Sequence, residues 1–200
     1  ELSVYECPII NVSNENDGRN CKMNILVITG SAHKKGTSSY LADAFIKGAE
    51  EAGHAVCRFD AAFKNVHPCI GCDSCQKNEH VCVFKDDMQE LNPELLKAEA
   101  VVFVSPIYYY DINAQIKAVI DRFYANNSVL KGAGKKAVLM LTYGDETEES
   151  AEGAIASYKG MVKYLEWKNA GIVSAKGCYV LDDVINSEYP KQAYEIGKSL

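Results

Sequence analysis

One segment near the amino end constrains the fold most, because a short apolar run is followed by a loop rich in hydroxyl groups and then by a helical pattern. Residues 24–53 read NILVITGSAHKKGTSSYLADAFIKGAEEAG. In α/β proteins, a strand, a polar loop and a helix start in this order bind phosphate, because the first N–H groups of a helix are unpaired and its dipole attracts anions. The segment therefore predicts an anion site with four hydroxyl side chains: Ser31, Thr37, Ser38 and Ser39.

Two well-known phosphate motifs do not match this loop. The nucleoside triphosphate motif G-x-x-x-x-G-K-[ST] fails because Gly30 and Gly36 lie one residue too far apart. The dinucleotide fingerprint G-x-G-x-x-G fails because alanine, and not glycine, stands two residues after Gly30. The loop suits a single phosphate group bound mainly by hydroxyls. A simpler interpretation, in which residues 37–39 only cap the following helix, stays open at this point.

The composition is typical of one globular domain. Two hundred residues can bury a substantial core, and 27 acidic against 21 basic residues give a net charge of −6. We find no block of lysine and arginine that would attract nucleic acid, no apolar run that approaches a membrane span and no secretory signal. We therefore expect a cytoplasmic protein that binds neither nucleic acid nor membranes.

The chain divides into a short extension and one domain. Residues 1–22 are polar, rich in asparagine and without a clear period, whereas Met23 directly precedes the first predicted strand. We therefore predict an N-terminal extension at 1–22 and a single domain at 23–200. Strands are predicted at 24–29, 55–59, 100–105, 136–142 and 172–180, and helices at 38–52, 87–98, 113–125, 147–169 and 188–200. Pro93 allows the second of these helices to be two shorter pieces.

This alternation predicts an α/β fold, in which helices cover both faces of a five-stranded parallel sheet in a three-layer sandwich. The expected strand order is 2-1-3-4-5. In such a sheet, ligands bind beyond the C-terminal strand ends, at the point between strands 1 and 3 where the order reverses. The predicted ligand-binding loops are therefore residues 30–39 and 105–112, with residues 142–146 beside them.

The loop after the third predicted strand is aromatic. From Ser105 it reads SPIYYYDINAQIKAVIDRF, so that Pro106 turns the chain and Ile107 precedes three tyrosines. Such side chains offer stacking area to a flat heteroaromatic ring. Three tyrosines that face a phosphate loop favour a ligand over local packing or a subunit contact. The loop after the fourth strand can close the other side of the ring with Thr142, Tyr143, Gly144 and Asp145.

Together these motifs resemble the flavodoxin-like NAD(P)H-dependent FMN reductases, and in particular their iron–sulfur flavoprotein branch. The first loop of that family is typically G-S-P-R-x-x-G-N-[ST], and GSAHKKGTS matches it in register. The second loop is typically [ST]-P-[IV]-Y-[WFY], followed by Q-[ILM]-K-x-[FVL]-[ILM]-D-R, and SPIYYYDINAQIKAVIDR matches it closely. The similarity covers about residues 23–180.

The resemblance implies that the chain binds FMN. It implies that the phosphate and the nearby ribityl chain are held by Ser31, His33, Thr37, Ser38 and Ser39. It further implies that the isoalloxazine ring is cradled by Pro106, Ile107, Tyr108, Tyr109 and Tyr110 and bordered by Thr142, Tyr143 and Gly144. Two positions depart from the family pattern. His33 replaces the common arginine, which makes charge neutralisation depend on pH, and Thr37 replaces the usual asparagine.

Four of the eight cysteines gather in one short segment, CIGCDSCQKNEHVC. At the spacing C-x2-C-x2-C-x6-C, Cys69, Cys72, Cys75 and Cys82 can wrap one iron–sulfur cluster. Four thiolates can also bind zinc, although structural zinc sites more often pair two separated C-x2-C knuckles. The resemblance to iron–sulfur flavoproteins implies a 4Fe–4S cluster that exchanges electrons with FMN. Many flavodoxin-like relatives carry a similar segment that only lines the flavin site, so both interpretations stay open.

The leading functional interpretation is an FMN-dependent oxidoreductase that takes hydride from NADH or NADPH and reduces a quinone, a flavin or another small acceptor. Because FMN carries the chemistry, we predict no obligatory acid among the side chains and expect residues 108–110 to shape substrate access. The alternative is an electron carrier with FMN and a 4Fe–4S cluster that serves a redox protein. A zinc-binding structural domain is a third interpretation. The resemblance also implies a homodimer or a homotetramer.

Overall fold

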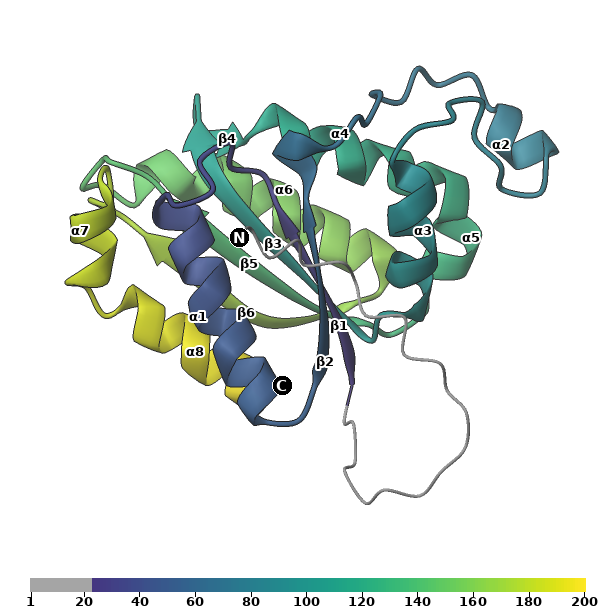
Figure 1. Ribbon diagram of the computed structural model, residues 1–200. Coiled ribbons are helices and arrows are strands. Elements are labelled where there is room, and N and C mark those ends of the chain that lie inside the picture. The colour runs from purple at the N-terminus through teal and green to yellow at the C-terminus, as the bar shows by residue number, and fades with distance from the viewer. Residues whose placement is uncertain (1–22) are drawn as a thin grey trace, which may run out of the picture.

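The computed structural model describes residues 23–200, so the extension predicted at 1–22 lies outside the described residues. The central sheet consists of β1 (Asn24–Thr29), β2 (Ala55–Asp60), β3 (Ala100–Tyr108), β5 (Lys136–Thr142) and β6 (Lys168–Ala175). These strands are parallel in the order β2-β1-β3-β5-β6, and the short β4 (Asp111–Ile112) pairs antiparallel with the end of β3 (Figure 1). Because β4 lies off this path, the order confirms the predicted 2-1-3-4-5 arrangement.

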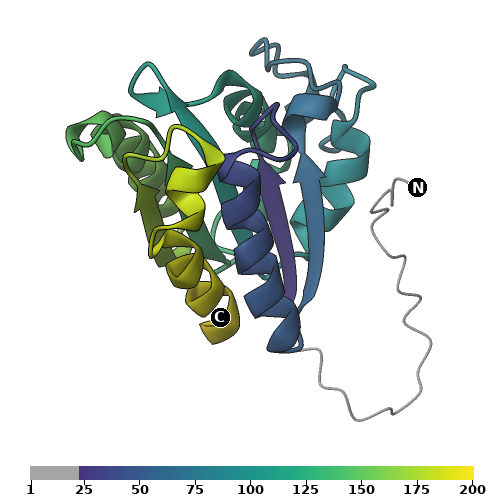
Figure 2. The ribbon, with the colours of Figure 1, turned by 60° about the vertical axis from the view of Figure 1, so that its left-hand side comes forward.

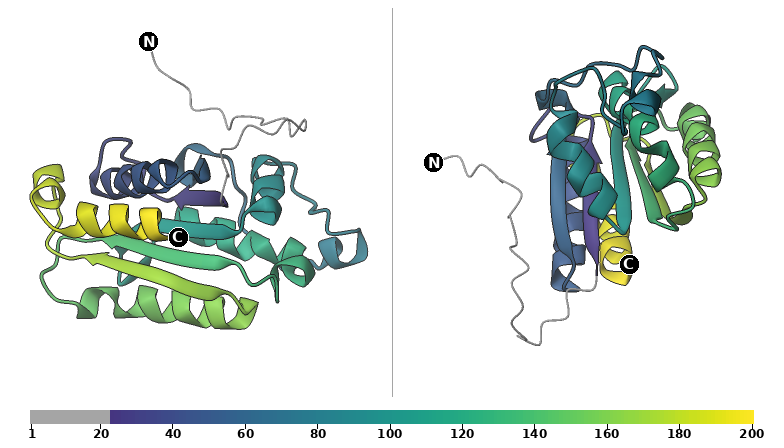
Figure 3. Two further views of the ribbon diagram at one scale, coloured as in Figure 1. Left: turned by 90° about the horizontal axis from the view of Figure 1, so that it is seen from below. Right: turned by 90° about the vertical axis from the view of Figure 1, so that its right-hand side faces the viewer.

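Helices cover both faces of the sheet and complete the predicted three-layer sandwich (Figure 3). One layer contains α1 (Thr37–Glu51), α7 (Leu181–Ile185) and α8 (Tyr189–Ser199), and the other contains α3 (Met88–Lys97), α4 (Ala114–Arg122) and α6 (Glu149–Leu165). Successive strand residues point to opposite faces of the sheet. Ile25 and Val27 therefore pack in the core beneath α1, α7 and α8, while Leu26 and Ile28 pack in the core beneath α3, α4 and α6. The remaining helical turns are η1 (Ala61–Phe63), α2 (Ser74–Lys77), η2 (Phe123–Asn126) and α5 (Asn127–Leu130).

Two glycines allow α1 and α8 to lie side by side on their face of the sheet (Figure 2). A Cβ atom at Gly48 would lie 2.1 Å from the carbonyl oxygen of Tyr194, and one at Gly197 would lie 2.2 Å from that of Phe45. Any side chain at either position would therefore push the two helices apart. This close contact fixes α1, whose first turn belongs to the predicted phosphate loop.

The last third of the chain differs from the prediction. The predicted helix at 147–169 ends at Leu165, because Glu166 adopts a left-handed conformation with φ 59° and Trp167 turns into the core. The indole N–H of Trp167 donates to the carbonyl of Leu130 at 2.7 Å. As a result β6 begins at Lys168 and ends at Ala175, about four residues before the predicted strand at 172–180, and the unpredicted α7 follows it.

Two other elements differ from the prediction, since α3 is one continuous helix and β3 is longer than expected. Pro93 lies inside α3 without dividing it, because Leu91 and Leu95 on either side are both buried and hold one continuous helix on the sheet. Strand β3 continues past the predicted end at residue 105, since Pro106 still pairs with Thr142 of β5 and the following residues pair with β4. Within residues 23–200, no helix has the length and apolar character needed to cross a membrane.

Candidate functional site

The reversal of strand order lies between β1 and β3, as predicted. The chain leaves β1 for α1 on one face of the sheet, whereas β3 is followed by β4 and by α4 on the opposite face. Because the five strands are parallel, the loops after β1, β3, β5 and β6 all lie at the carboxyl edge of the sheet. In α/β proteins this is the usual place for a ligand.

The start of α1 is open to an anion. Its N-cap residue is Gly36, which has an extended backbone with φ −93° and ψ −179°, and within the described residues no side chain caps this helix end. The interpretation that residues 37–39 serve as caps is therefore wrong, since they form the first turn itself. That turn contains no acidic residue. The N–H groups and the positive end of the helix dipole thus remain available for a phosphate.

The first turn of α1 is joined directly to the end of β5. The hydroxyl oxygens of Ser38 and Thr142 lie 2.7 Å apart, and the Thr37 hydroxyl donates to the same Thr142 oxygen at 3.3 Å. Ser38 and Thr142 are only 1% and 2% exposed. The structure thereby brings the predicted phosphate loop against the predicted border of the ring site.

The backbone of His33 organises the rest of the loop after β1. Its carbonyl accepts hydrogen bonds from the Gly36 N–H at 3.0 Å and from the Ser39 hydroxyl at 3.1 Å. Its own N–H donates to the hydroxyl of Ser31, a buried residue, at 3.1 Å. The residue as a whole is exposed, as are Lys34 and the lysine that follows. The loop is therefore ordered by hydrogen bonds to the His33 backbone, two of which involve serine hydroxyls, and its basic residues are exposed.

Asn113 ties the loop after β1 to the end of β3, a role that the sequence did not reveal. Its side-chain amide donates to the Gly30 carbonyl at 2.5 Å, and its N–H donates to the Ser105 hydroxyl at 3.0 Å. A Cβ atom at Gly30 would lie 2.0 Å from the side-chain oxygen of Asn113. Only glycine fits there, so the two loops at the strand-order reversal are held in fixed register.

The tyrosines of the predicted ring cradle lie on a hairpin. Tyr109 and Tyr110 form the two-residue turn between β3 and β4, with φ values of 49° and 66°. Such turns usually contain asparagine and glycine, because L residues rarely tolerate positive φ. Tyr109 is 100% exposed, and Tyr108 and Tyr110 are also exposed. The half-buried Pro106 and Ile107 stay at the sheet edge, and Pro106 pairs with Thr142, so these two lie nearer the start of α1 along the sheet.

The loop after β5 is joined to the loop after β6. Tyr143 turns its ring into the core, where its hydroxyl lies 3.0 Å from that of Ser174 and burial raises the pKa of the phenol. The next residue, Gly144, is exposed, and the ring of Tyr179 packs on it. Of the residues predicted to border the ring, Thr142 and Tyr143 are therefore buried and Gly144 faces solvent. The adjacent Tyr179 was not recognised in the sequence.

The cysteine segment extends from the body of the protein in the loop that carries α2 (Figure 1). Cys69 and Cys72 are exposed, Cys75 is buried and Cys82 is half-buried. Within residues 23–200, no three or more side chains of histidine, cysteine, aspartate or glutamate are grouped to hold a metal ion. The predicted four-thiolate ligand set is therefore not assembled in this arrangement. A hydrogen bond from the Ser74 hydroxyl lowers the pKa of the Cys72 thiol.

This loop is nevertheless fastened to the domain at several points. The Tyr124 hydroxyl donates to Asp73 at 3.0 Å, and the Gln76 amide donates to the Tyr124 carbonyl at 3.0 Å. Nδ1 of His80 lies 2.9 Å from the Ala125 carbonyl oxygen, which agrees with a structural role for this histidine. The cysteines thus lie on a loop held against the helical turns that follow α4.

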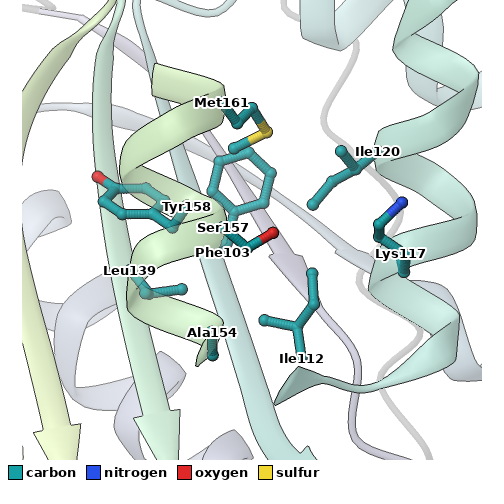
Figure 4. A pocket seen from close by; sticks show the side chains of 9 residues that line it. All are labelled: Phe103, Ile112, Lys117, Ile120, Leu139, Ala154, Ser157, Tyr158 and Met161. Atoms are coloured by element: carbon teal, nitrogen blue, oxygen red, sulfur yellow. The ribbon is translucent and has the colours of Figure 1, made fainter. Parts of the chain in front are cut away.

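A separate apolar pocket lies between α4 and α6, on the face of the sheet opposite α1 (Figure 4). Its floor comes from β3 and β5, and its walls come from β4, α4 and α6. The lining residues are Phe103, Ile112, Lys117, Ile120, Leu139, Ala154, Ser157, Tyr158 and Met161. None of these was predicted as a site residue, and the pocket does not include the start of α1.

Comparisons with known proteins agree with this architecture. A family model described as NADPH-dependent FMN reductase matches residues 23–171. An iron-sulfur flavoprotein of Archaeoglobus fulgidus is 31% identical over 180 residues, which cover 89% of this chain and 79% of that protein. Another iron-sulfur flavoprotein, from Methanosarcina thermophila, is 30% identical over 100 residues, which cover 50% of this chain and 51% of that protein.

Solved structures also share the fold. An NAD(P)H:quinone oxidoreductase from Methanothermobacter marburgensis superposes with a TM-score of 0.65 at 20% identity, over 88% of this chain and 95% of that chain. An azoreductase from Bacillus anthracis superposes with a TM-score of 0.64 at 16% identity, over 88% of this chain and 99% of that chain. At such identities the likeness supports the fold alone.

Proposed function

Because this chain belongs to the NADPH-dependent FMN reductase family, we propose that it binds FMN at the start of α1 and passes electrons from a reduced nicotinamide to a quinone, a flavin or a similar small acceptor. Family membership makes it an NAD(P)H-dependent flavin oxidoreductase. The observation that carries the proposed site is the uncapped first turn of α1, beside Thr142 of β5, at the reversal of strand order.

The residues present fit the phosphate of FMN. The first turn of α1 offers N–H groups without a competing side-chain cap or acidic residue. The same segment adds two hydroxyls, that of Ser31 in the loop before the helix and that of Ser38 in its first turn. Arg58 of β2 supports this turn, because its guanidinium donates to the Ser39 hydroxyl at 3.4 Å. These groups would bind and orient the phosphate, while Lys34 and its neighbours add positive charge in solvent.

The ring of the cofactor would lie toward β3 and β5. Two backbone segments would border the ring, one at the end of β3 and one after β5. They are Pro106 and Ile107 in the first and the exposed Gly144 in the second. FMN, when bound, supplies the redox chemistry, since it can accept hydride from NADH or NADPH and return electrons to an acceptor. The side chains of this site position that ring and limit access to it, and none is required as an acid.

Anaerobic reduction of the bound flavin tests the activity. The protein is loaded with FMN, freed of excess cofactor and mixed with NADH or NADPH, while the visible flavin absorbance is followed. We expect bleaching by one or both nucleotides, and recovery on addition of a quinone. Stoichiometric FMN that neither nucleotide reduces would exclude the reductase function.

A second candidate function rests on the cysteine spacing and on the names of the relatives. The matched relatives named above are called iron-sulfur flavoproteins, and this chain carries Cys69, Cys72, Cys75 and Cys82 on one anchored loop, although the four thiols are not gathered around one point in the described residues. An electron carrier of this kind would gain about four iron atoms per chain on anaerobic reconstitution with iron and sulfide, with a broad visible shoulder over the flavin bands. A Cys72→Ser variant is the control. Equal iron in the variant and the parent would refute the cluster.

A further inference from the structure

The loop that follows β6, residues 176–180, is held rigidly to the loop that follows β5. The N–H of Cys178 donates to the Tyr143 carbonyl at 2.8 Å, and the N–H of Gly177 donates to the Asp145 carbonyl at 2.8 Å. The Cys178 side chain is buried in the core. Gly177 has a φ of 66°, and a Cβ atom there would lie 2.7 Å from the Glu146 carboxylate, so this turn requires glycine.

This anchoring places Tyr179 on the backbone of Gly144. A Cβ atom at Gly144 would lie 2.9 Å from Cδ2 and 3.2 Å from Cβ of Tyr179. Any other residue at position 144 would displace the ring. Tyr179 is nevertheless 84% exposed, so most of its surface remains open to solvent. The Tyr179 side chain thus contacts Gly144 on one side, and the rest of its ring is open to a ligand.

Tyr179 also lies on the edge that carries the proposed FMN site. Thr142, two residues before Gly144, forms the hydroxyl contact with Ser38 at the start of α1. The strand end that borders the cofactor therefore continues directly into the loop on which Tyr179 packs. We therefore expect a molecule that approaches the proposed flavin site over this loop to pass the exposed Tyr179 ring.

The surroundings of Tyr179 are strongly acidic. Asp145 accepts hydrogen bonds from the Ser150 hydroxyl at 2.6 Å and the Thr147 N–H at 3.1 Å, which lower the pKa of its carboxyl group. Lys176 pairs with Glu148 at 3.3 Å and offsets one charge. Six carboxylates lie on the two joined loops and the adjoining helix starts: Asp145, Glu146, Glu148, Glu149, Asp182 and Asp183. This rim would repel an anion that approaches over these two loops, so the anionic NADH or NADPH of the proposed function would reach the flavin from another side.

We propose that Tyr179 determines acceptor specificity, by stacking on a planar aromatic acceptor that is uncharged or cationic. This inference rests on the proposed function, because the acceptor is defined by its approach to bound FMN. The Tyr179 ring supplies stacking area, and the acidic rim disfavours anionic compounds of the same shape. The family match, which ends at residue 171, does not include Tyr179.

Equilibrium binding to the oxidised FMN-loaded protein tests this without turnover. The neutral probe is dimethylnaphthoquinone with both quinone-ring positions methylated, because the exposed Cys69 and Cys72 thiols would add to an unsubstituted ring. Calorimetry is expected to give a dissociation constant about three- to tenfold higher in Tyr179→Ala, with Tyr179→Phe close to the parent. Tyr164→Ala, which removes an exposed tyrosine near the far end of α6, is the matched control and should leave this constant unchanged.

The outcomes separate this inference from the proposed function. An unchanged quinone constant in Tyr179→Ala, with FMN still bound, overturns the role of Tyr179 alone. Loss of FMN from Tyr179→Ala, with folding intact by circular dichroism, also overturns it, because the ring would then hold the cofactor. Failure of the parent to bind FMN overturns both. The anionic probe, anthraquinone sulfonate, should bind more tightly as salt rises, and no change with salt contradicts the charge selection.

Discussion

Arg122 and Asp86 form a buried ion pair that joins α4 to the base of the cysteine loop. The guanidinium Nη1 lies 2.6 Å from Asp86 Oδ2 and Nη2 lies 3.1 Å from Oδ1, and the two side chains are 3% and 4% exposed. The same pair holds His67, whose carbonyl accepts from Arg122 at 2.7 Å and whose N–H donates to Asp86 at 2.9 Å. The segment that carries the four clustered cysteines, residues 67–86, is therefore fixed at both of its ends by this one ion pair.

Removing Arg122 should destabilise the protein strongly, because it leaves the Asp86 carboxylate buried without its partner. We expect Arg122→Met to lower the free energy of unfolding by about 3 kcal/mol, measured by urea denaturation. The matched control on the same helix is Lys117→Met, which breaks the exposed pair with Asp121 and should cost less than about 1 kcal/mol. Equal losses in the two variants would contradict a structural role for the buried pair.

Asp86 should also make stability depend on pH. Burial by itself would raise the pKa of Asp86, but hydrogen bonds from Arg122 and from the His67 N–H hold it below its ordinary value of 3.8. A carboxyl group whose pKa is lower in the folded state stabilises the fold above its unfolded-state pKa and loses this contribution as the pH falls through the folded-state pKa.

We therefore expect the free energy of unfolding to decrease as the pH falls below about 4, and to decrease less in Asp86→Asn, which does not titrate there. Urea denaturation at neutral pH and at about one pH unit below 4 measures both proteins. The same decrease in both would show that Asp86 does not contribute to the acid sensitivity.

Gly30 should tolerate no side chain, because the Asn113 amide occupies that space. We expect Gly30→Ala to lower the free energy of unfolding by about 1–3 kcal/mol and to weaken FMN binding, since the loops after β1 and β3 would separate. The control is Gly160→Ala in α6, where nothing lies within 4 Å of the added Cβ atom. That change should stabilise the helix by about 0.5–1 kcal/mol. If both variants lowered the free energy of unfolding to the same extent, the loss in Gly30→Ala would not be due to the Asn113 contact.

The sequence predicted the strands that are apolar throughout. The runs at 24–29 and 136–142 coincide with β1 and β5, because each is buried on both faces and contains an uninterrupted set of aliphatic residues. Strand β6 was misplaced because its first residues, from Lys168, are exposed and polar at the sheet edge and continue a helical pattern. Its true start depends on the burial of Trp167, which is a tertiary contact.

The sequence outlined the proposed site where that site depends on local motifs, and not where it depends on contacts between distant loops. The loop from Gly30 to Ser39 was located from its residue types alone. Asn113 and Tyr179 were not, because each contacts a glycine that is distant in the sequence. Asn113 contacts Gly30, 83 positions away, and Tyr179 contacts Gly144, 35 positions away. The tyrosine hairpin was unexpected for a related reason: Tyr109 and Tyr110 adopt positive φ values that their intrinsic preferences oppose.

The relative affinity for FMN and riboflavin tests the central claim most directly, because the two flavins differ only in the phosphate. Titration with each flavin, followed by flavin fluorescence, gives both dissociation constants, and Ser38→Ala should raise the constant for FMN more than that for riboflavin. If the first turn of α1 binds the phosphate, FMN should bind about a hundredfold more tightly than riboflavin. Equal affinities for the two flavins would contradict the phosphate site.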